Sequence, residues 1–183
     1  MTVALGPSVV RDFTAMGTSC RVILAREDAA ALERAERWVE RTAARLTRFD
    51  EDSELCRLNR AAGHWIPISP LLEQLLRTAL WAHERSGGLV HAGVLPSLLG
   101  LGYRRPFRER RLLPIPAVPP APPPPLPVML TLRRGAARLR RGTAIDLGGI
   151  AKGWMADRLA ARLDQPSVVN LGGDLFASAG DSA

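Results

Sequence analysis

Hydrophobic residues recur at helical spacing in two long stretches of the chain, and each stretch begins and ends at a recognisable signal. Over residues 28–48, apolar side chains return every three or four positions, and Asp28 can cap the first turn. Over residues 70–86, the same spacing follows Ser69 and a proline, which is a favoured first helical residue. Two glycines then end this second stretch. The pattern predicts two amphipathic helices, each with one buried face.

Shorter apolar segments predict strands between and after these helices. A short capped helix is expected within residues 49–60, and a further helix from about residue 151 to 163. Gly135 separates two of the expected strands, which indicates a β-hairpin. Because strands and helices do not alternate strictly, the predicted fold class is α+β. Strands are expected at residues 20–25, 128–132, 137–141, 144–147 and 168–171.

A proline-rich stretch at residues 106–127 interrupts this pattern. Proline lacks a backbone N–H, so we expect neither a helix nor a central strand there. We expect instead a polyproline-type surface connection within a single domain that spans residues 1–183.

The formal net charge is +7, and nearly all basic residues are arginines, because Lys152 is the only lysine. A basic chain raises the possibility of nucleic-acid binding. However, neither dense arginine cluster, at residues 104–111 and 133–141, is interleaved with aromatic residues for base stacking. We therefore expect a solvated arginine-rich surface and no nucleic-acid partner. Lys152 supplies a compact point charge where the rest of the chain uses arginine, which makes it a candidate binding residue.

The compartment is inferred from what the sequence lacks. It holds no run of about 18 uncharged apolar residues, so no transmembrane segment is expected. The N-terminus has no cationic start of a secretory signal, and the default expectation is the cytoplasm. Cys20 and Cys56 lie far apart without metal-ligand spacing and are expected to be free, buried thiols.

The most informative motif is the octet at residues 146–153, which reads Asp-Leu-Gly-Gly-Ile-Ala-Lys-Gly. Its glycines let the backbone approach a ligand closely, and the following helix start directs free N–H groups to the same place. Lys152 lies in the first turn of that helix. The octet matches neither the Walker phosphate loop nor the dinucleotide fingerprint. It suits an anionic or nucleotide ligand, and the alternative is a purely structural turn.

Three further motifs accompany the octet. Residues 15–18 read Ala-Met-Gly-Thr, residues 49–60 contain Phe-Asp-x-x-Ser-Glu-Leu-x-x-Leu-Asn, and residues 168–175 contain Val-Asn-Leu-Gly-Gly-Asp. In this order, the four motifs resemble those of the FAD:protein FMN transferase family, often called ApbE. The resemblance covers about residues 11–178 and rests most on the complete octet.

This resemblance implies an α+β domain related to the T-fold. It also implies an enzyme that binds FAD and Mg²⁺, splits the pyrophosphate and attaches FMN through a phosphoester to a Ser or Thr of an acceptor protein. Members of the family are often periplasmic or membrane-anchored. The residues that the resemblance assigns to FAD are Met16, Phe49, Leu89, Val90, His91, Asp146 and Lys152. It assigns the backbone carbonyl of Gly149 to the metal, which suits a hard cation.

Two departures from the family pattern accompany these assignments. Where the family usually has Gly-Gly-x-Phe-Asp-Pro-Thr, this chain has His91 in place of the aspartate and Gly93 in place of the threonine. The family also continues beyond its Asn-Leu-Gly-Gly-Asp strand into a segment that completes the metal site, and no residue here is assigned as catalytic. The expectation is a truncated transferase that is inactive alone. The alternative is a degenerate or fragmentary flavin-binding homologue without activity.

Overall fold

The computed structural model describes residues 8–106 and 121–179, and the chain divides into two compact units. One unit combines residues 1–43 with residues 151–183, so the two ends of the sequence fold together. The other unit is the continuous segment of residues 44–150. The single domain expected over residues 1–183 stays a prediction.

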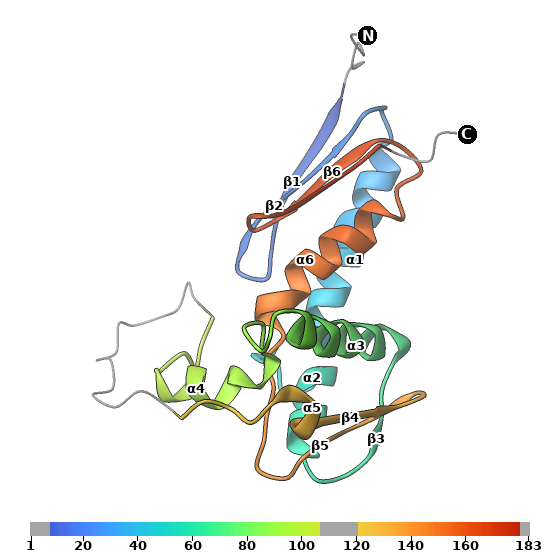
Figure 1. Ribbon diagram of the computed structural model, residues 1–183. Helices are drawn as coiled ribbons and strands as arrows, with labels where there is room; N and C mark the ends of the chain where they lie inside the picture. Colours follow the sequence, from blue (N-terminus) through green and yellow to red (C-terminus); the bar gives the residue numbers. More distant parts are fainter. Residues whose placement is uncertain (1–7, 107–120, 180–183) are drawn as a thin grey trace. The chain divides into compact units, whose positions relative to one another are not determined.

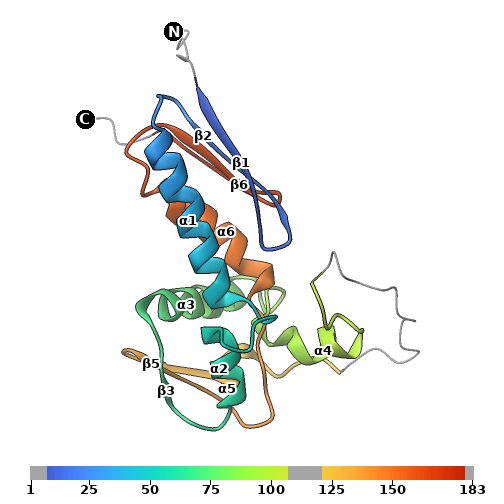
Figure 2. The same cartoon turned by 180° about the vertical axis from the view of Figure 1, so that it is seen from behind.

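The unit built from the two ends contains a four-stranded antiparallel sheet with helices along one face (Figures 1 and 2). Helices α1 (Ala29–Leu46) and α6 (Gly148–Ala160) supply this cover, each with most of its length in this unit. The strand order is β1-β2-β6-β7, with β1 (Val9–Ala15), β2 (Thr18–Leu24), β6 (Ser167–Leu171) and β7 (Asp174–Ser178).

Alternation along the two central strands explains why one sheet face is buried. Val22 and Leu24 of β2, and Val169 and Leu171 of β6, are fully buried. In a strand, successive side chains point to opposite faces. The intervening residues of both strands are therefore directed to the other face and are exposed or half-buried. The predicted strand at residues 168–171 is confirmed, and the one predicted at 20–25 is found slightly earlier.

Helix α1 follows the predicted pattern. The backbone N–H of Ala31 donates to the Asp28 carboxylate over 2.8 Å, which satisfies one of the free donors at the helix start. Leu32, Ala35, Val39 and Leu46 are buried, while Ala43 is half-buried. The single buried stripe is what a surface helix packed on a sheet requires.

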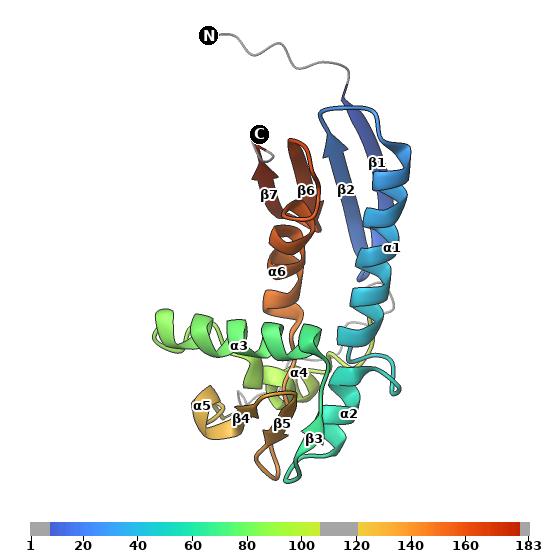
Figure 3. The ribbon, with the colours of Figure 1, turned by 90° about the vertical axis from the view of Figure 1, so that its right-hand side faces the viewer.

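The continuous unit combines one long helix and several short ones with a three-stranded sheet of order β3-β5-β4 (Figure 3). Its strands are β3 (Ile66–Pro67), β4 (Leu130–Arg133) and β5 (Ala136–Leu139), and its helices are α2 (Glu54–Arg60), α3 (Pro70–Arg85), η1 (Ala92–Val94), α4 (Leu95–Gly100) and α5 (Leu126–Met129). Leu55 and Leu58 of α2, with Leu72, Leu75 and Leu76 of α3, are fully buried in its core. The predicted hairpin around Gly135 is confirmed as β4 and β5.

Two predictions about this unit are wrong in part. Residues 144–147 form no strand, although they run extended between β5 and α6. The end of the proline-rich stretch is helical, because α5 accommodates Pro127 in its first turn, where a missing N–H costs nothing. Residues 107–120, which make up most of that stretch, lie outside the described residues.

No helix in the described part of the chain is long and apolar enough to cross a membrane.

Candidate functional site

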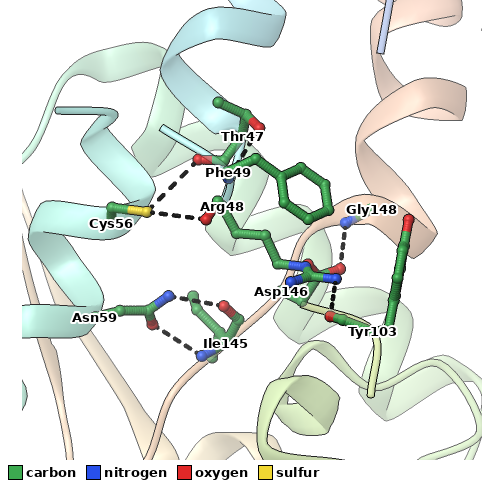
Figure 4. Close-up of polar contacts among 9 residues, drawn as sticks. All are labelled: Thr47, Arg48, Phe49, Cys56, Asn59, Tyr103, Ile145, Asp146 and Gly148. Carbon is green, nitrogen blue, oxygen red and sulfur yellow. Dashed lines mark hydrogen bonds and ion pairs between the residues drawn. The ribbon is translucent and has the colours of Figure 1, made fainter. Parts of the chain in front are cut away.

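In the continuous unit, a nearly buried ion pair joins the start of the octet to the end of α1. Arg48 Nε lies 2.9 Å from Asp146 Oδ2, and these side chains are only 6% and 12% exposed (Figure 4). The other carboxylate oxygen of Asp146 accepts the backbone N–H of Gly148, the first residue of α6, over 2.8 Å. Both oxygens of this expected FAD-binding residue are therefore already engaged within the protein.

Two aromatic rings enclose the Arg48 guanidinium. Its central carbon lies 4.2 Å from the Phe49 ring centroid and 4.4 Å from the Tyr103 centroid (Figure 4). Arg48 Nη2 also donates to the Tyr103 carbonyl over 2.7 Å. A cation over aromatic faces is stabilised by the ring quadrupole, more so when it is desolvated. Arg48 thus holds Phe49, Tyr103 and Asp146 in one fixed cluster.

The Ser-Glu-Leu motif builds the frame beside this cluster. Ser53 caps α2 by accepting the N–H of Cys56 over 3.0 Å. The buried Glu54 carboxylate accepts the hydroxyl of Ser69, the N-cap of α3, over 2.8 Å and pairs with Arg45 over 3.1 Å. The motif therefore ties the starts of two helices together.

Asn59 completes the same frame. Its side-chain amide donates to the Ile145 carbonyl and accepts the Ile145 N–H, both over 2.9 Å (Figure 4). The Asp146 N–H donates to the Ala92 carbonyl over 2.8 Å. Residues 144–147 are thus held extended by a side-chain amide and by η1, which explains why the expected strand is absent.

In the unit built from the two ends, an ion pair joins the octet to the Asn-Leu-Gly-Gly-Asp motif. Lys152 Nζ lies 3.2 Å from Asp174 Oδ2, and the two side chains are 31% and 45% exposed. The N–H of Gly173 donates to the Asn170 side chain over 2.9 Å. A side chain at Gly172 would collide with Thr18, so the Met-Gly-Thr motif also packs closely against this turn.

Met16 occupies a conformation that side chains rarely adopt. It has a φ of 53° and Gly17 a φ of 70°, which are the values of a type I′ turn between β1 and β2. Such turns favour Asn-Gly, and a bulky residue with positive φ is strained. The motif therefore lies in a hairpin turn, and β1, which the hydrophobic pattern did not predict, precedes it.

The segment after α3 borders an open groove with a volume of about 1110 Å³ in the continuous unit. Of the three residues that the resemblance places there, Leu89 and His91 line the groove, and Leu89 is 91% exposed. Trp81 and four prolines supply further lining. At Gly93, where the resemblance predicts a threonine, an added Cβ would lie 2.6 Å from Met129 Sδ, so a side chain does not fit without a shift of Met129.

His83 and His91 form the polar part of the groove lining. His83 Nε2 accepts the Leu126 N–H over 3.4 Å, so its proton is on Nδ1, which donates to the Val90 carbonyl over 3.2 Å. His91 Nδ1 accepts the Gly93 N–H over 2.9 Å, and its Nε2–H donates to the Pro124 carbonyl over 3.0 Å.

The two rings meet edge to face with centroids 4.6 Å apart. Burial, and secondly the neighbouring His83, hold the pKa of His91 below its ordinary value. Both ring nitrogens of His91 have a backbone partner that suits its neutral form. His91 therefore presents a neutral imidazole where the family has a carboxylate.

The described residues do not form a complete Mg²⁺ site. No group of three or more His, Cys, Asp or Glu side chains within residues 8–106 and 121–179 could hold a metal ion. The Asp146 carboxylate, which lies near Gly149 in the sequence, is engaged by Arg48. Gly149 has open space around its Cα, but one backbone carbonyl does not meet the usual requirement of Mg²⁺ for carboxylates.

Sequence patterns missed Arg48, Tyr103 and His83. Arg48 is one arginine among many, and only its place directly before the Phe-Asp motif could have singled it out. Tyr103 is the single tyrosine of the chain, which was a usable signal. Cys20 and Cys56 are free as predicted, although Cys56 is half-buried.

Comparison with known proteins identifies the family. The ApbE family model matches residues 16–182. A protein of Treponema pallidum (strain Nichols) named FAD:protein FMN transferase is 31% identical over 197 residues. That alignment covers 94% of this chain and 53% of the relative, so the chain spans about half of the relative's length.

Solved structures of flavin transferases share the fold. The apo form of the Pseudomonas stutzeri flavinyl transferase ApbE matches with a TM-score of 0.77 at 20% identity, over 97% of this chain and 63% of that chain. The flavin transferase ApbE from Vibrio cholerae gives a TM-score of 0.77 at 20% identity, over 94% and 59%. The predicted α+β fold is confirmed. Since the family model matches most of the sequence, the chain belongs to the ApbE family.

Proposed function

We propose that this chain is the flavin-binding part of an FAD:protein FMN transferase. In that reaction, the hydroxyl oxygen of an acceptor Thr or Ser bonds to the phosphorus of the FMN half of FAD. The pyrophosphate P–O bond breaks, AMP leaves, and the hydroxyl proton passes to a base that we do not assign. The family membership and the relative of that name support this proposal.

The groove bordered by Leu89 and His91 is the observation that supports flavin binding most directly. Its lining is mainly apolar, with Trp81 62% exposed and Leu89 91% exposed, as expected for a surface that gains by covering a flat ring. The neutral imidazole of His91 adds no charge there, and a groove of about 1110 Å³ can accommodate a dinucleotide. We assign Leu89 and His91 to the flavin on this basis, and Val90 because it lies between them in the sequence and is 40% exposed.

The Arg48 cluster offers the next contacts. Phe49 is 40% exposed, so one part of its ring remains available for stacking although Arg48 lies over it. A carboxylate has about four acceptor positions, and Asp146 uses two of them in its contacts with Arg48 and Gly148. Asp146 can therefore accept a further N–H or O–H from the nucleotide without breaking the ion pair.

In the unit built from the two ends, we assign Lys152 and Met16 to FAD. The Lys152–Asp174 pair is partly exposed, and such pairs contribute little stability. A phosphate oxygen can replace Asp174 as the partner of Lys152 at small cost. Met16 is 36% exposed in its strained turn and presents a polarisable side chain.

Mg²⁺ would contact this chain through the Gly149 carbonyl and would supply charge stabilisation to the transferring phosphate. The described residues do not provide the carboxylates that such a site requires. We therefore derive no step through the metal. The same observation favours the second candidate function, a flavin-binding homologue without transferase activity.

A transfer assay tests the proposal. The chain is incubated with FAD, Mg²⁺ and an acceptor protein that contains a target Thr, and flavin fluorescence on the acceptor is followed on a denaturing gel. Because the described residues lack a metal-binding cluster, we expect no fluorescent acceptor band from the 183-residue chain alone, although FAD binds. A fluorescent band would show that the chain carries the full activity. Absence of both the band and FAD binding would contradict both candidate functions.

A further inference from the structure

The outer face of the β3-β5-β4 sheet is occupied by arginines around one tryptophan. Side chains of paired residues share a face, so Thr131 and Arg138 point the same way, as does Arg133 two residues along β4. The buried face carries Leu130, Ala137 and Leu139. Arg133 and Arg138 are therefore held on the solvent side by the same alternation that builds the core.

Trp65 lies in the middle of these arginines. Pro67 pairs with Ala136 and Ile66 with Ala137, so continuing this register places Trp65 opposite Arg138 on the outer face. The Arg133 and Arg138 guanidinium carbons lie 4.4 Å and 5.1 Å from the Trp65 ring centroid. The ring thus restrains two long side chains, which lowers the entropy that they would lose on binding a partner.

Among the described residues, the positive charge of this face is not balanced by carboxylates paired with its arginines. Residues 121–145 contain no Asp or Glu, and neither do residues 55–72, which lead into and through β3. Among the described residues, no carboxylate pairs with Arg133, Arg138 or Arg140. Glu73, at the border of the sheet, is engaged by Arg77 and by the N–H of Gly135. Neighbouring like charges on a sheet are destabilising, so the arrangement costs stability unless an acidic partner offsets it.

A hollow of about 310 Å³ adjoins these arginines. Arg138, Arg140 and Arg141 line it together with Gly63 and Thr131. The Arg141 side chain packs against Gly63, with Nε 3.4 Å from the position of an added Cβ. The hollow gives one carboxylate side chain a place to be surrounded by guanidinium groups, which bind carboxylates in a bidentate manner.

We propose that this outer sheet face, defined by Trp65, Arg133, Arg138, Arg140 and Arg141, docks an acidic polypeptide segment. A polypeptide fits better than a nucleic acid, because the Trp65 ring is already covered by guanidinium groups and is not free to stack on bases. Trp and Arg are also the residues most enriched at energetically important positions of protein interfaces. The acceptor protein of the transfer reaction would supply this segment, and this part of the proposal rests on the proposed function.

The test measures binding of a fluorescein-labelled peptide of alternating Glu and Ser to the 183-residue chain by fluorescence anisotropy. We expect saturable binding that weakens with salt, and no binding of the matched peptide with Gln in place of Glu. In the double variant Arg138→Gln and Arg140→Gln, the affinity should fall roughly five- to thirty-fold, since two exposed ion pairs are lost. Both residues are exposed, so the variant should remain folded.

The matched control removes the same charge elsewhere. Arg41 and Arg85 are exposed, and no carboxylate pairs with either in the described part of the chain. In the double variant Arg41→Gln and Arg85→Gln, the peptide affinity should stay within about two-fold of wild type. Equal weakening by both double variants would overturn the proposal, because binding would then follow net charge alone.

A competing oligonucleotide separates the two kinds of polyanion. A single-stranded oligonucleotide with as many negative charges as the peptide should displace it poorly. Tighter binding of the oligonucleotide would overturn the proposal in favour of a polyphosphate surface. The peptide assay contains no FAD, so its failure is distinct from failure of the proposed function, which is judged by flavin binding and transfer.

Discussion

At the scale of single residues, charge placement separates groups that hold the structure from groups that remain available to a ligand. Arg48 and Asp146 are nearly buried and use their contacts within the protein. Lys152 keeps about a third of its side chain exposed and has one partly exposed partner, Asp174. The sequence pointed to Lys152 through its rarity, and its partial exposure is compatible with that role.

Replacing Lys152 tests this interpretation. If Lys152 exchanges Asp174 for a phosphate oxygen of FAD, Lys152→Ala should weaken FAD binding about ten-fold, the effect of one charge-assisted hydrogen bond. The measurement is a fluorescence titration with FAD. Arg158→Ala, on the exposed side of the same helix, is the control and should leave the affinity unchanged. Unchanged affinity in a folded Lys152→Ala variant would show that Lys152 is only a surface residue.

His91 makes the free energy of unfolding depend on pH. The pKa of His91 is held below the ordinary value of 6.5, so below that pH the unfolded chain binds a proton that the folded chain does not. The contribution of neutral His91 to the free energy of unfolding is fully present above pH 6.5. It is lost as the pH falls toward the pKa of His91 in the folded chain. Glu84 lines the same groove, whereas η1 and α5 bring no charged side chain to it.

Urea unfolding at pH 7.5 and pH 5 measures this effect. The wild-type chain should lose stability at the lower pH, and His91→Gln should lose less of it, because glutamine cannot be protonated. His64→Gln, which changes an exposed histidine, should keep the wild-type pH dependence. An unchanged pH dependence in His91→Gln would exclude His91 as its origin.

At the scale of elements, side chains substitute for backbone partners at the places where regular structure ends. A strand was predicted at residues 144–147, of which all but Asp146 are apolar, and the position of Asn59 shows why no strand forms. The Asn59 amide provides the donor and the acceptor that a neighbouring strand would provide. Sequence periodicity cannot reveal such a substitution, since the partner lies far away in the chain.

Removing the Asn59 side-chain amide should lower the free energy of unfolding. Asn59→Ala leaves the Ile145 N–H and carbonyl without their partners, and we expect a loss of about 2–3 kcal/mol in the free energy of unfolding by urea denaturation. The exposed neighbour provides the control, because Arg60→Ala should change stability by less than about 0.5 kcal/mol. Similar small effects of both substitutions would show that the amide does not hold residues 144–147.

The β1–β2 turn offers the opposite test, a gain in stability. Met16 has positive φ, which asparagine tolerates better, so Met16→Asn should raise the free energy of unfolding by about 0.5–1 kcal/mol. If Met16 contacts FAD as proposed, the same substitution should weaken FAD binding. A stabilised variant with unaltered FAD affinity would remove Met16 from the proposed site, and a destabilised variant would contradict the account of the turn.

At the scale of the whole molecule, local sequence signals were sufficient to predict the long helices. Contacts between residues far apart in the sequence were not predicted. The caps at Asp28 and Ser69 fixed the starts of α1 and α3 as expected, because each acts within one helical turn. The clustering of Trp65 with Arg133 and Arg138 was missed, and the arginines were interpreted as an ordinary solvated surface. The aromatic residue comes from a different strand, so only the sheet register brings it to the arginines.

For the candidate site, too, the sequence indicated the motifs but not the contacts between distant residues. The four motifs were sufficient to indicate the family, which the family model and the relative confirm. Contacts such as the ion pair between Arg48 and Asp146 and that between Lys152 and Asp174 depend on tertiary structure. Neither pair could be deduced from spacing, because each joins residues that are far apart in the sequence.

Titration of the 183-residue chain with FAD tests directly whether the chain binds flavin in the groove bordered by Leu89 and His91. The account predicts saturable binding, followed as a change in flavin fluorescence, and a roughly ten-fold or larger loss of affinity in Leu89→Glu, which places a charge on the apolar groove. Leu89 is 91% exposed, so this change should not affect folding. Val10→Glu, at a residue that is 49% exposed outside the groove, should bind FAD as the wild type does. Absence of saturable FAD binding to the wild-type chain, or equal affinity in the Leu89→Glu variant, would contradict the account.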